Sequence, residues 1–286
     1  RETPFRLLQA PEPWPAGGPR RAALSAFGFG GNDAHLLVEA WDPELTAPPM
    51  PVAPAPAGGA IAVVGLGARV GAGQDAGDFA RALFGAEGLA PAQRQAAALR
   101  WTPRQLKFPP ADLQAALPQQ LWLVAAGEEA MAGVKPPARE RVGVYAGMQC
   151  DGAIARYGVR WRLPEWLERW QAAGLVGEFA DAWLAQAKDA ANPFLTAAGV
   201  LGTLPNVVAN RLNSQFDLGG ASFAVSEEEL SGVRALALGC RALRAGELDM
   251  ALVGAVDMAT EPVQAQAARE AVAAERHEPG DAGNSI

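Results

Sequence analysis

The sequence is poor in the residues that bind metals or form disulfides. It contains two cysteines, Cys150 and Cys240, which lie far apart in the chain, and only two histidines. No CxxC pair occurs, so the sequence predicts neither a disulfide framework nor a zinc site. A metal or a directly bound cofactor is therefore not expected.

The sequence also lacks a basic excess and a long apolar run. Lysine and arginine number 24 against 31 acidic residues, a net charge of −7, which disfavours nucleic acid as a partner. No run approaches the roughly 20 apolar residues of a membrane span, and no signal peptide opens the chain, so we expect a cytoplasmic protein. Because it starts at Arg1 without methionine, we expect a piece of a longer polypeptide.

What the sequence does contain is enough apolar surface for a large core, since 50% of its 286 residues are hydrophobic. Apolar runs and helical periodicities alternate along the chain, which favours an α/β fold with a covered, mostly parallel mixed sheet. The predicted strands are residues 36–38, 60–64, 142–146, 221–225 and 250–256. The predicted helices are residues 78–84, 118–133, 204–216, 231–243 and a pair within 163–188 that divides near 174–177.

Composition also predicts the domain boundaries. Residues 43–59 are rich in proline and alanine without periodicity, which is typical of a semi-extended linker. Before it, residues 1–42 include a glycine-rich turn at 27–31 and a strand. After it, residues 60–274 form the main domain, and residues 275–286 are a polar tail.

Gly65 and Gly67 follow the predicted strand 60–64, as in a dinucleotide-binding turn. The third glycine of that motif is absent, because Val70 occupies its position and Gly71 arrives one residue late. No acidic residue ends a second strand at the required distance. The sequence therefore favours an ordinary turn over a nucleotide site.

Residues 223–232 form a predicted elbow in which a strand turns sharply into an apolar helix. A helix N-terminus is where enzymes present a nucleophile, since its free N–H groups and dipole stabilise a thiolate or an oxyanion. The elbow holds no cysteine but carries Glu227, Glu228 and Glu229. From physical chemistry alone, capping of the helix by Ser226 and the glutamates is the favoured interpretation.

The flanks of the elbow resemble the β-ketoacyl synthases of fatty-acid and polyketide assembly lines. The similar segments are LPNVVANRLNSQFDLGGASFAV before the elbow and VRALALGCRALRAGELDMALVGAVDM after it, within residues 204–258, together with residues 61–73 and 141–147. The resemblance implies a thiolase-like fold and the N-terminal half of such a domain over residues 60–274. Active members have a Thr-Ala-Cys-Ser-Ser run at the elbow, and the flanks place that nucleophilic cysteine at Glu229.

A second segment, residues 21–35, resembles the closing motif of another ketosynthase, where the family usually has Gly-Thr-Asn-Ala-His. The resemblance implies that His35 supports decarboxylation of a malonyl extender by stabilising negative charge. Asp33 replaces the asparagine of that motif. The alternative interpretation is a histidine at a strand edge without a catalytic role.

The order of these segments looks like the fused ketosynthase and chain-length-factor pair of polyunsaturated fatty acid synthases and iterative polyketide synthases. The parent is then a β-ketoacyl-[acyl carrier protein] synthase, and this cysteine-less domain is a partner that shapes the acyl tunnel. The resemblance implies a ketosynthase partner in a pseudo-homodimer or heterodimer, paired through residues 221–225. It also implies an acyl carrier protein whose phosphopantetheine delivers acyl and malonyl thioesters.

Two other functions fit the same residues. One is an initiating malonyl-carrier decarboxylase, although a carboxylate at Glu229 is unhelpful beside a developing enolate. The other is a dimerisation scaffold alone.

The cysteines and tryptophans are weaker candidates for site residues. Cys240 is expected in the core. Cys150 could border the acyl tunnel, but it has no basic neighbour to activate it. The tryptophans of 163–188 suit a core, a dimer interface or the acyl channel, with core packing favoured.

Overall fold

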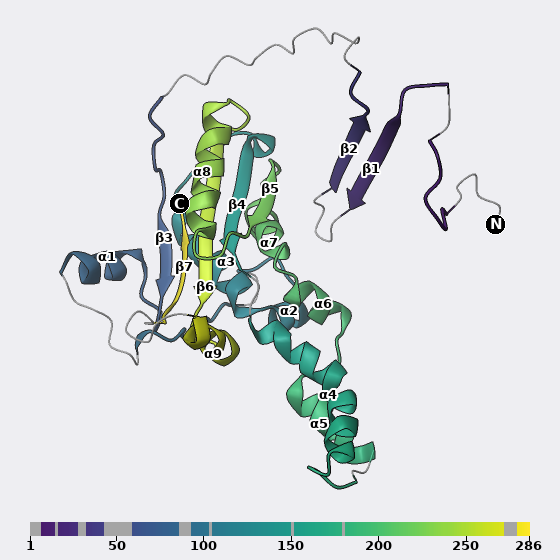
Figure 1. Cartoon of the computed structure of the whole chain (residues 1–286). Helices are drawn as coiled ribbons and strands as arrows, with labels where there is room; N and C mark the ends of the chain where they lie inside the picture. Colours follow the sequence, from purple (N-terminus) through teal and green to yellow (C-terminus); the bar gives the residue numbers. More distant parts are fainter. Residues whose placement is uncertain are drawn as a thin grey trace. The chain divides into compact units, whose positions relative to one another are not determined.

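The computed structural model describes residues 7–14, 17–27, 33–42, 59–85, 93–102, 105–149, 152–178, 181–271 and 279–286. The chain divides into two compact units, residues 1–54 and 55–286, and the division falls inside the predicted linker (Figure 1). Most of that linker and the glycine-rich residues 28–32 lie outside the described residues. None of the helices in the described parts is long and apolar enough to cross a membrane.

The first unit contains a two-stranded antiparallel hairpin. Strand β1 (Arg21–Phe27) pairs with β2 (Asp33–Glu39), and an ion pair of 2.7 Å joins Arg21 to Glu39 across the two strands. The predicted strand at 36–38 lies within β2, whereas β1 was not expected. Every residue of β1 is exposed, and a hairpin without a packed face is only marginally stable by itself.

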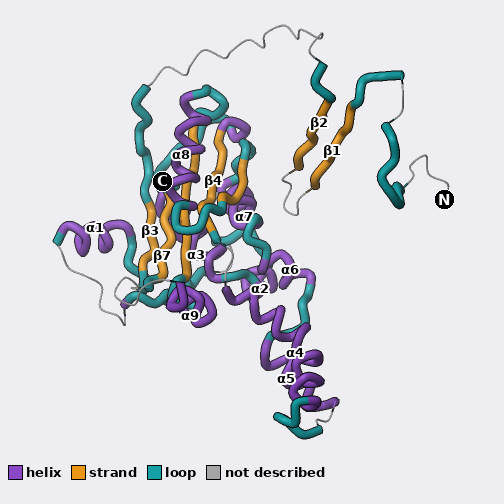
Figure 2. The backbone as a smooth tube through the Cα atoms, in the orientation of Figure 1, coloured by secondary structure: helices purple, strands orange, loops and turns teal. Residues whose placement is uncertain are grey.

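The second unit is built on a five-stranded mixed sheet in the order β3-β7-β6-β4-β5 (Figure 2). Its strands are β3 (Gly67–Val70), β4 (Val142–Met148), β5 (Ser222–Val225), β6 (Met250–Met258) and β7 (Asp281–Ser285). Strand β4 pairs in parallel with β5 and β6, while β7 is antiparallel to β3 and β6. The sheet is thus mixed as predicted, but half of its pairings are antiparallel. Every residue of β4 is buried, as expected of a covered inner strand.

Helices cover both faces of this sheet. On one face, α3 (Pro118–Ala130) packs on β3, β7 and β6, and α7 (Val207–Phe216) packs on α3 and β4. On the other face, α8 (Ser231–Arg244) packs on β4 and β6. Two separate hydrophobic clusters result, one on each face, and the larger lies beneath α3 and α7. The predicted helices at 118–133, 204–216 and 231–243 are confirmed.

The remaining helices lie around the sheet. They are α1 (Ala76–Phe84), α2 (Pro110–Ala115), α4 (Ala155–Ala172), α5 (Asp181–Ala191), α6 (Ala197–Thr203) and α9 (Pro262–Ala271). Helices α4 and α5 pack on each other and project away from the sheet (Figure 1). The favoured core position of their tryptophans is wrong for Trp170 and Trp183, which are 40% and 44% exposed, because this projecting pair has no described layer over it. Phe179 lies outside the described residues.

Two predicted segments differ from the structure. Residues 60–64 were expected to form a buried strand, but they have no strand partner, and Val63 and Val64 are about two-thirds exposed (66% and 65%). The strand begins only at Gly67, where β7 supplies hydrogen-bond partners. The predicted polar tail is also wrong for residues 281–285, because these form β7, which lies between β3 and β6. Pairing with a neighbouring strand, which composition does not reveal, decides where each strand forms.

Candidate functional site

The elbow predicted at residues 223–232 is present, and β5 leads through residues 226–230 into α8. Ser231 holds it together: its Oγ accepts the N–H of Glu227 at 2.9 Å and donates to the carbonyl oxygen of Glu228 at 2.6 Å. The N–H groups of Leu230 and Ser231 close the turn on the carbonyls of Glu227 and Glu228. A buried hydroxyl therefore fixes the backbone of the elbow.

The backbone at the elbow is strained at one residue. Glu228 has a φ of 50°, in the left-handed region that non-glycine residues rarely enter. Such strain costs of order 1–3 kcal/mol and persists where the surrounding contacts enforce it, which happens most often at functional sites. Here the Ser231 hydroxyl bonded to the Glu228 carbonyl supplies the constraint. The strained residue immediately precedes Glu229.

The expected capping of α8 by Ser226 is wrong. The N-cap residue is Leu230, and no side chain caps the helix there. Ser231 is the side chain that bonds the turn instead, because it is 5% exposed and faces the elbow. Its position three residues after the strained Glu228 gave no capping signal in the sequence.

The three glutamates differ in their contacts. Glu227 lies 3.5 Å from Arg234, an exposed pair that contributes little to stability. The residues that the structure describes provide no ion pair for Glu229, whose side chain is exposed at the end of the elbow. The carboxylate of Glu229 is thus open to solvent.

Glycines allow α8 to approach the sheet closely. A Cβ on Gly147 would lie 2.6 Å from the Ser231 carbonyl carbon, and a Cβ on Gly232 would lie 2.8 Å from the Ala255 Cβ. A Cβ on Gly239 would lie 2.8 Å from Val253 Cγ2. The face of α8 that packs on the sheet therefore consists of small residues.

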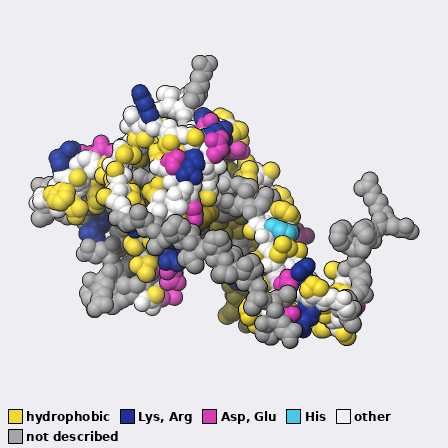
Figure 3. Space-filling view, turned by 90° about the horizontal axis from the view of Figure 1, so that it is seen from above, with side chains coloured by type: hydrophobic (Ala, Val, Ile, Leu, Met, Phe, Trp, Pro, Cys, Tyr) yellow, Lys and Arg dark blue, Asp and Glu magenta, His cyan; other side chains and the backbone are white. Residues whose placement is uncertain are grey.

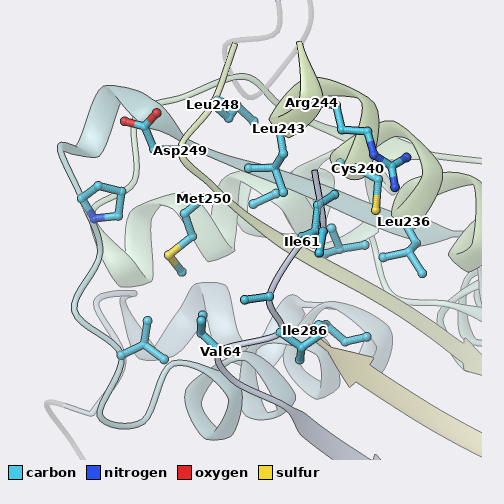
Figure 4. A pocket seen from close by; sticks show the side chains of 18 of the residues that line it. Ile61, Val64, Leu236, Cys240, Leu243, Arg244, Leu248, Asp249, Met250 and Ile286 are labelled. Carbon is cyan, nitrogen blue, oxygen red and sulfur yellow. The ribbon is translucent and has the colours of Figure 1, made fainter. Parts of the chain in front are cut away.

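The apolar stripe of α8 is not its buried face. Val233, Leu236, Ala237, Cys240 and Leu243 recur at helical spacing on one side of the helix, yet Val233 is 67% and Leu236 41% exposed. The buried residues are Ser231, Ala235, Gly239 and Ala242. Cys240 is half-buried with a free thiol and lines a cavity beside β6 rather than the core (Figure 4), which corrects the core position expected for it. Cys150 lies outside the described residues.

Tyr145 supports β5 from the neighbouring strand. Its ring packs edge to face on Phe223 at 5.1 Å, and burial, with a further contribution from Glu247, raises the pKa of its phenol. The tyrosine therefore stays neutral at physiological pH.

Within the described residues, no group of three or more His, Cys, Asp or Glu side chains is placed to hold a metal ion.

His35, the other predicted site residue, lies on β2 in the first unit and is exposed. Its Nδ1 lies 2.7 Å from the Oγ of Ser25 on β1, in the pair that the hairpin register aligns. That contact occupies Nδ1, and none of the described residues forms a hydrogen bond with Nε2. His35 belongs to the first unit and Glu229 to the second.

Gly65 and Gly67 lie against α3, which agrees with the predicted turn and not with a nucleotide site. A Cβ on Gly65 would lie 1.9 Å from the Ala130 carbonyl oxygen, and one on Gly67 would lie 2.0 Å from that of Ala126. Both glycines thus let the chain pass close to α3. Gly67 also opens a strand and not a helix, so the phosphate-binding helix N-terminus of a dinucleotide fold is missing.

Comparison with known proteins gives one family. The model of the family described as "Beta-ketoacyl synthase, N-terminal domain" matches residues 59–282. A subunit of the polyunsaturated fatty acid synthase of Thraustochytrium sp. is 29% identical over 89% of this chain and 14% of its own length. The hybrid PKS-NRPS synthetase poxE of Penicillium oxalicum is 51% identical over 16% of this chain and 1% of its own.

Solved structures give the same fold. The PfaC keto synthase-chain length factor matches with a TM-score of 0.64 and 18% identity, over 93% of this chain and 32% of that one. The ishigamide ketosynthase/chain length factor matches with a TM-score of 0.54 and 16% identity, over 78% and 60% of the two chains. The predicted thiolase-like ketosynthase fold is therefore confirmed. This chain spans less than two thirds of the length of each of these relatives. Because the family model matches more than half of it, the chain belongs to the β-ketoacyl synthase family.

Proposed function

We propose that this chain contributes a chain-length-factor-like partner domain to the condensing unit of a fatty-acid or polyketide synthase. The observation that carries the proposal is Glu229 at the elbow, in the position that the flanking residues assign to the nucleophilic cysteine. The names of the relatives support it, since one belongs to a polyunsaturated fatty acid synthase and two solved structures are ketosynthase and chain-length-factor pairs.

The chemistry of the elbow supports a loss of catalysis. Condensation by a cysteine enzyme begins with a thiolate that accepts an acyl group, and a carboxylate cannot form that thioester. Among the described residues the one thiol is that of Cys240, which lies eleven residues further along the chain on α8. At 1.5 Å per residue this is about 16 Å along the helix, too far to replace the missing group.

The proposed partners follow from the family. A ketosynthase domain with its own cysteine would perform the condensation, and a carrier protein would deliver acyl and malonyl groups on phosphopantetheine. This domain would border the tunnel that receives the growing chain and so limit its length. His35, whose Nε2 has no hydrogen-bond partner among the described residues, would belong to the ketosynthase motif and stabilise charge during malonyl decarboxylation.

Acyl trapping in the full-length parent protein tests the central point. The parent is incubated with an acyl-loaded carrier protein, and acylated peptides are mapped by mass spectrometry. We expect acylation in the partner ketosynthase and none in residues 221–244. A Glu229→Cys variant is the matched control, because it restores the thiol without changing the elbow. Acylation of Cys240 in the unaltered protein would contradict the proposal.

Carbon dioxide release from a malonyl-loaded carrier separates the proposal from a decarboxylase function. We expect the rate of the parent to be unchanged by Glu229→Gln and to fall at least tenfold in His35→Ala. If Glu229→Gln alters the rate and His35→Ala does not, the elbow is the decarboxylating site. If neither changes the rate and product length is also independent of this domain, only a scaffold remains.

The proposed interface with the ketosynthase runs along β5. This strand is the last of its sheet, and Phe223 on it is 37% exposed. A charge at Phe223 should weaken pairing, so light scattering of the Phe223→Glu parent should give a lower mass. The control is Phe84→Glu on α1, where an equally large aromatic is 88% exposed and away from β5. Equal masses for both variants would refute the interface.

A further inference from the structure

The two faces of the β1–β2 hairpin differ in their side chains, because successive residues of a strand point to opposite faces. One face consists of apolar residues alone: Ala22, Leu24, Ala26, Ala34, Leu36 and Val38. The other face is mixed, and it carries two polar cross-strand pairs: Arg21 with Glu39, and Ser25 with His35. His35 therefore lies on the opposite face from the one that resembles a core surface.

The register of the hairpin brings the side chains of Ser25 and His35 together. Ala40 donates its N–H to the carbonyl oxygen of Arg20 at 2.8 Å, so these two opposed residues form a hydrogen-bonded pair. Such pairs alternate with non-hydrogen-bonded pairs along an antiparallel ladder, which makes Ser25 and His35 a non-hydrogen-bonded pair. In pairs of this kind the Cα atoms are only about 4.5 Å apart and the side chains are closer. The short side chain of serine therefore reaches the imidazole.

The contact fixes one nitrogen of the ring. The Oγ of Ser25 lies 2.7 Å from Nδ1 of His35, at the short end of the range for a hydrogen bond between nitrogen and oxygen. Among the described residues, neither of these two atoms has another hydrogen-bond partner. Because the ladder sets both Cα positions, the contact also holds the orientation of the ring. Nε2, on the far side of the imidazole, is directed away from Ser25.

The direction of this hydrogen bond decides what Nε2 can do. A serine hydroxyl both donates and accepts, whereas a neutral imidazole carries its proton on one nitrogen only. If Ser25 donates to Nδ1, the ring proton is on Nε2, and Nε2 can donate a hydrogen bond. If Nδ1 donates to Ser25, Nε2 has a lone pair, which repels a negatively charged oxygen. The partner of one ring nitrogen thus selects the chemistry of the other.

We propose that Ser25 is a positioning residue, whose hydroxyl donates to Nδ1 and so keeps the proton of His35 on Nε2. The proposal rests on the function proposed for His35, the stabilisation of negative charge during malonyl decarboxylation. In that step the bond between the α-carbon and the carboxylate breaks, carbon dioxide leaves, and the electron pair is delocalised onto the thioester oxygen. A hydrogen bond from Nε2–H stabilises this enolate oxygen without transfer of the ring proton. The other tautomer would leave the ring in place but remove the stabilisation.

Nitrogen NMR of the full chain measures the tautomer directly. With ¹⁵N-labelled histidine, ring signals come from His35 and His277 only, and a His277→Ala variant assigns them. At about pH 9, where histidine is neutral, we expect the proton of His35 on Nε2. Ser25→Asp, whose carboxylate only accepts, should move the proton to Nδ1. A proton on Nδ1 in the unaltered chain, or the same tautomer in both chains, would overturn the proposal.

Carbon dioxide release from a malonyl-loaded carrier by the parent protein measures the consequence. Ser25→Ala should lower the rate about tenfold, the effect of one lost hydrogen bond, whereas Ser25→Thr keeps the hydroxyl and should retain the rate. The matched control is Glu39→Gln, which weakens the other polar pair of the same face and should leave the rate unchanged.

The outcomes separate this proposal from the function on which it rests. Equal losses in Ser25→Ala and Glu39→Gln would show that Ser25 acts only by stabilising the hairpin, and would overturn its positioning role while leaving His35 in place. An unchanged rate in His35→Ala would refute the function proposed for His35, and the role of Ser25 with it, even if the proton is on Nε2.

Discussion

Helices α3 and α8 cover opposite faces of one sheet, yet they bury very different side chains. Nine of the 13 residues of α3 are buried, including Trp122 and Leu123, and α7 packs across them. Only four of the 14 residues of α8 are buried, and all are small. The described chain therefore covers the face of the sheet under α3 with large buried side chains. The outer side of α8 has no such cover among the described residues.

The difference shows that an apolar stripe does not identify the side of a helix that packs on its own sheet. The stripe of α8 includes Val233 and Leu236, which face outward, while its glycine and alanine residues meet β4 and β6. Figure 3 shows hydrophobic side chains over much of the visible surface, interspersed with charged ones.

The largest expected effect is the difference in unfolding free energy between two variants, each of which shortens one leucine, on α3 or on α8. Leu123 on α3 is fully buried, so Leu123→Ala should lower the free energy of unfolding by about 2–5 kcal/mol. Leu236→Ala on α8 should change it by less than about 0.5 kcal/mol, because that side chain already contacts water. Urea unfolding followed by circular dichroism measures both. Similar losses for the two variants would mean that the outer side of α8 is covered in solution.

The next contrast concerns the close approach of α8 to the sheet. Gly147→Ala places a methyl group 2.6 Å from the backbone of Ser231 and should cost about 1–3 kcal/mol of stability. Gly158→Ala is the control, since nothing lies within 4 Å of its new Cβ in α4, and alanine should stabilise that helix by about 0.5–1 kcal/mol. A neutral Gly147→Ala would show that α8 can move away from β4.

Sequence reasoning succeeded where local pattern decides the structure. Strand β4 is a continuous apolar run, α7 has a clear helical periodicity, and a turn marks the elbow after β5, so each was predicted close to its observed bounds. The family was recognisable because long flanks of the elbow agree in order and spacing. These features depend on residues close together in the chain.

Sequence reasoning failed where partners distant in the chain decide. Residues 60–64 have strand composition but lack a paired neighbour, and residues 281–285 are polar yet lie between two strands. The role of Ser231 was missed for another reason: its partner Glu228 lies only three residues away, but the left-handed backbone of Glu228 that directs its carbonyl to Ser231 has no signal in the composition. His35 and Glu229 remain assigned by resemblance, because nothing in their local contacts identifies a reaction.

A smaller effect contrasts two adjacent glutamines of α3. Gln120 donates to the carbonyls of Gly202 and Leu204 and accepts from the buried Arg211 at 2.6 Å. Gln120→Met leaves these groups unsatisfied and should cost about 1–3 kcal/mol. The amide of Gln119 is buried without a partner in the described residues, so Gln119→Met should be neutral or stabilising. Equal losses in urea unfolding would mean that Gln119 has a partner in solution.

The smallest expected effect is a dependence of stability on pH beside the cavity of β6. Two hydrogen bonds from Arg141 lower the pKa of Asp249, at 2.7 and 3.2 Å. A carboxyl with a lowered pKa in the folded state stabilises the fold above its ordinary pKa, near 3.8, and loses that contribution as pH falls through the lower value. Asp249→Asn should therefore reduce the urea midpoint slightly at pH 7, and the difference should shrink as the pH falls below 3.8. Because both side chains are largely exposed, 1 M salt should shrink the difference at pH 7, and a difference that salt does not alter would contradict an electrostatic origin.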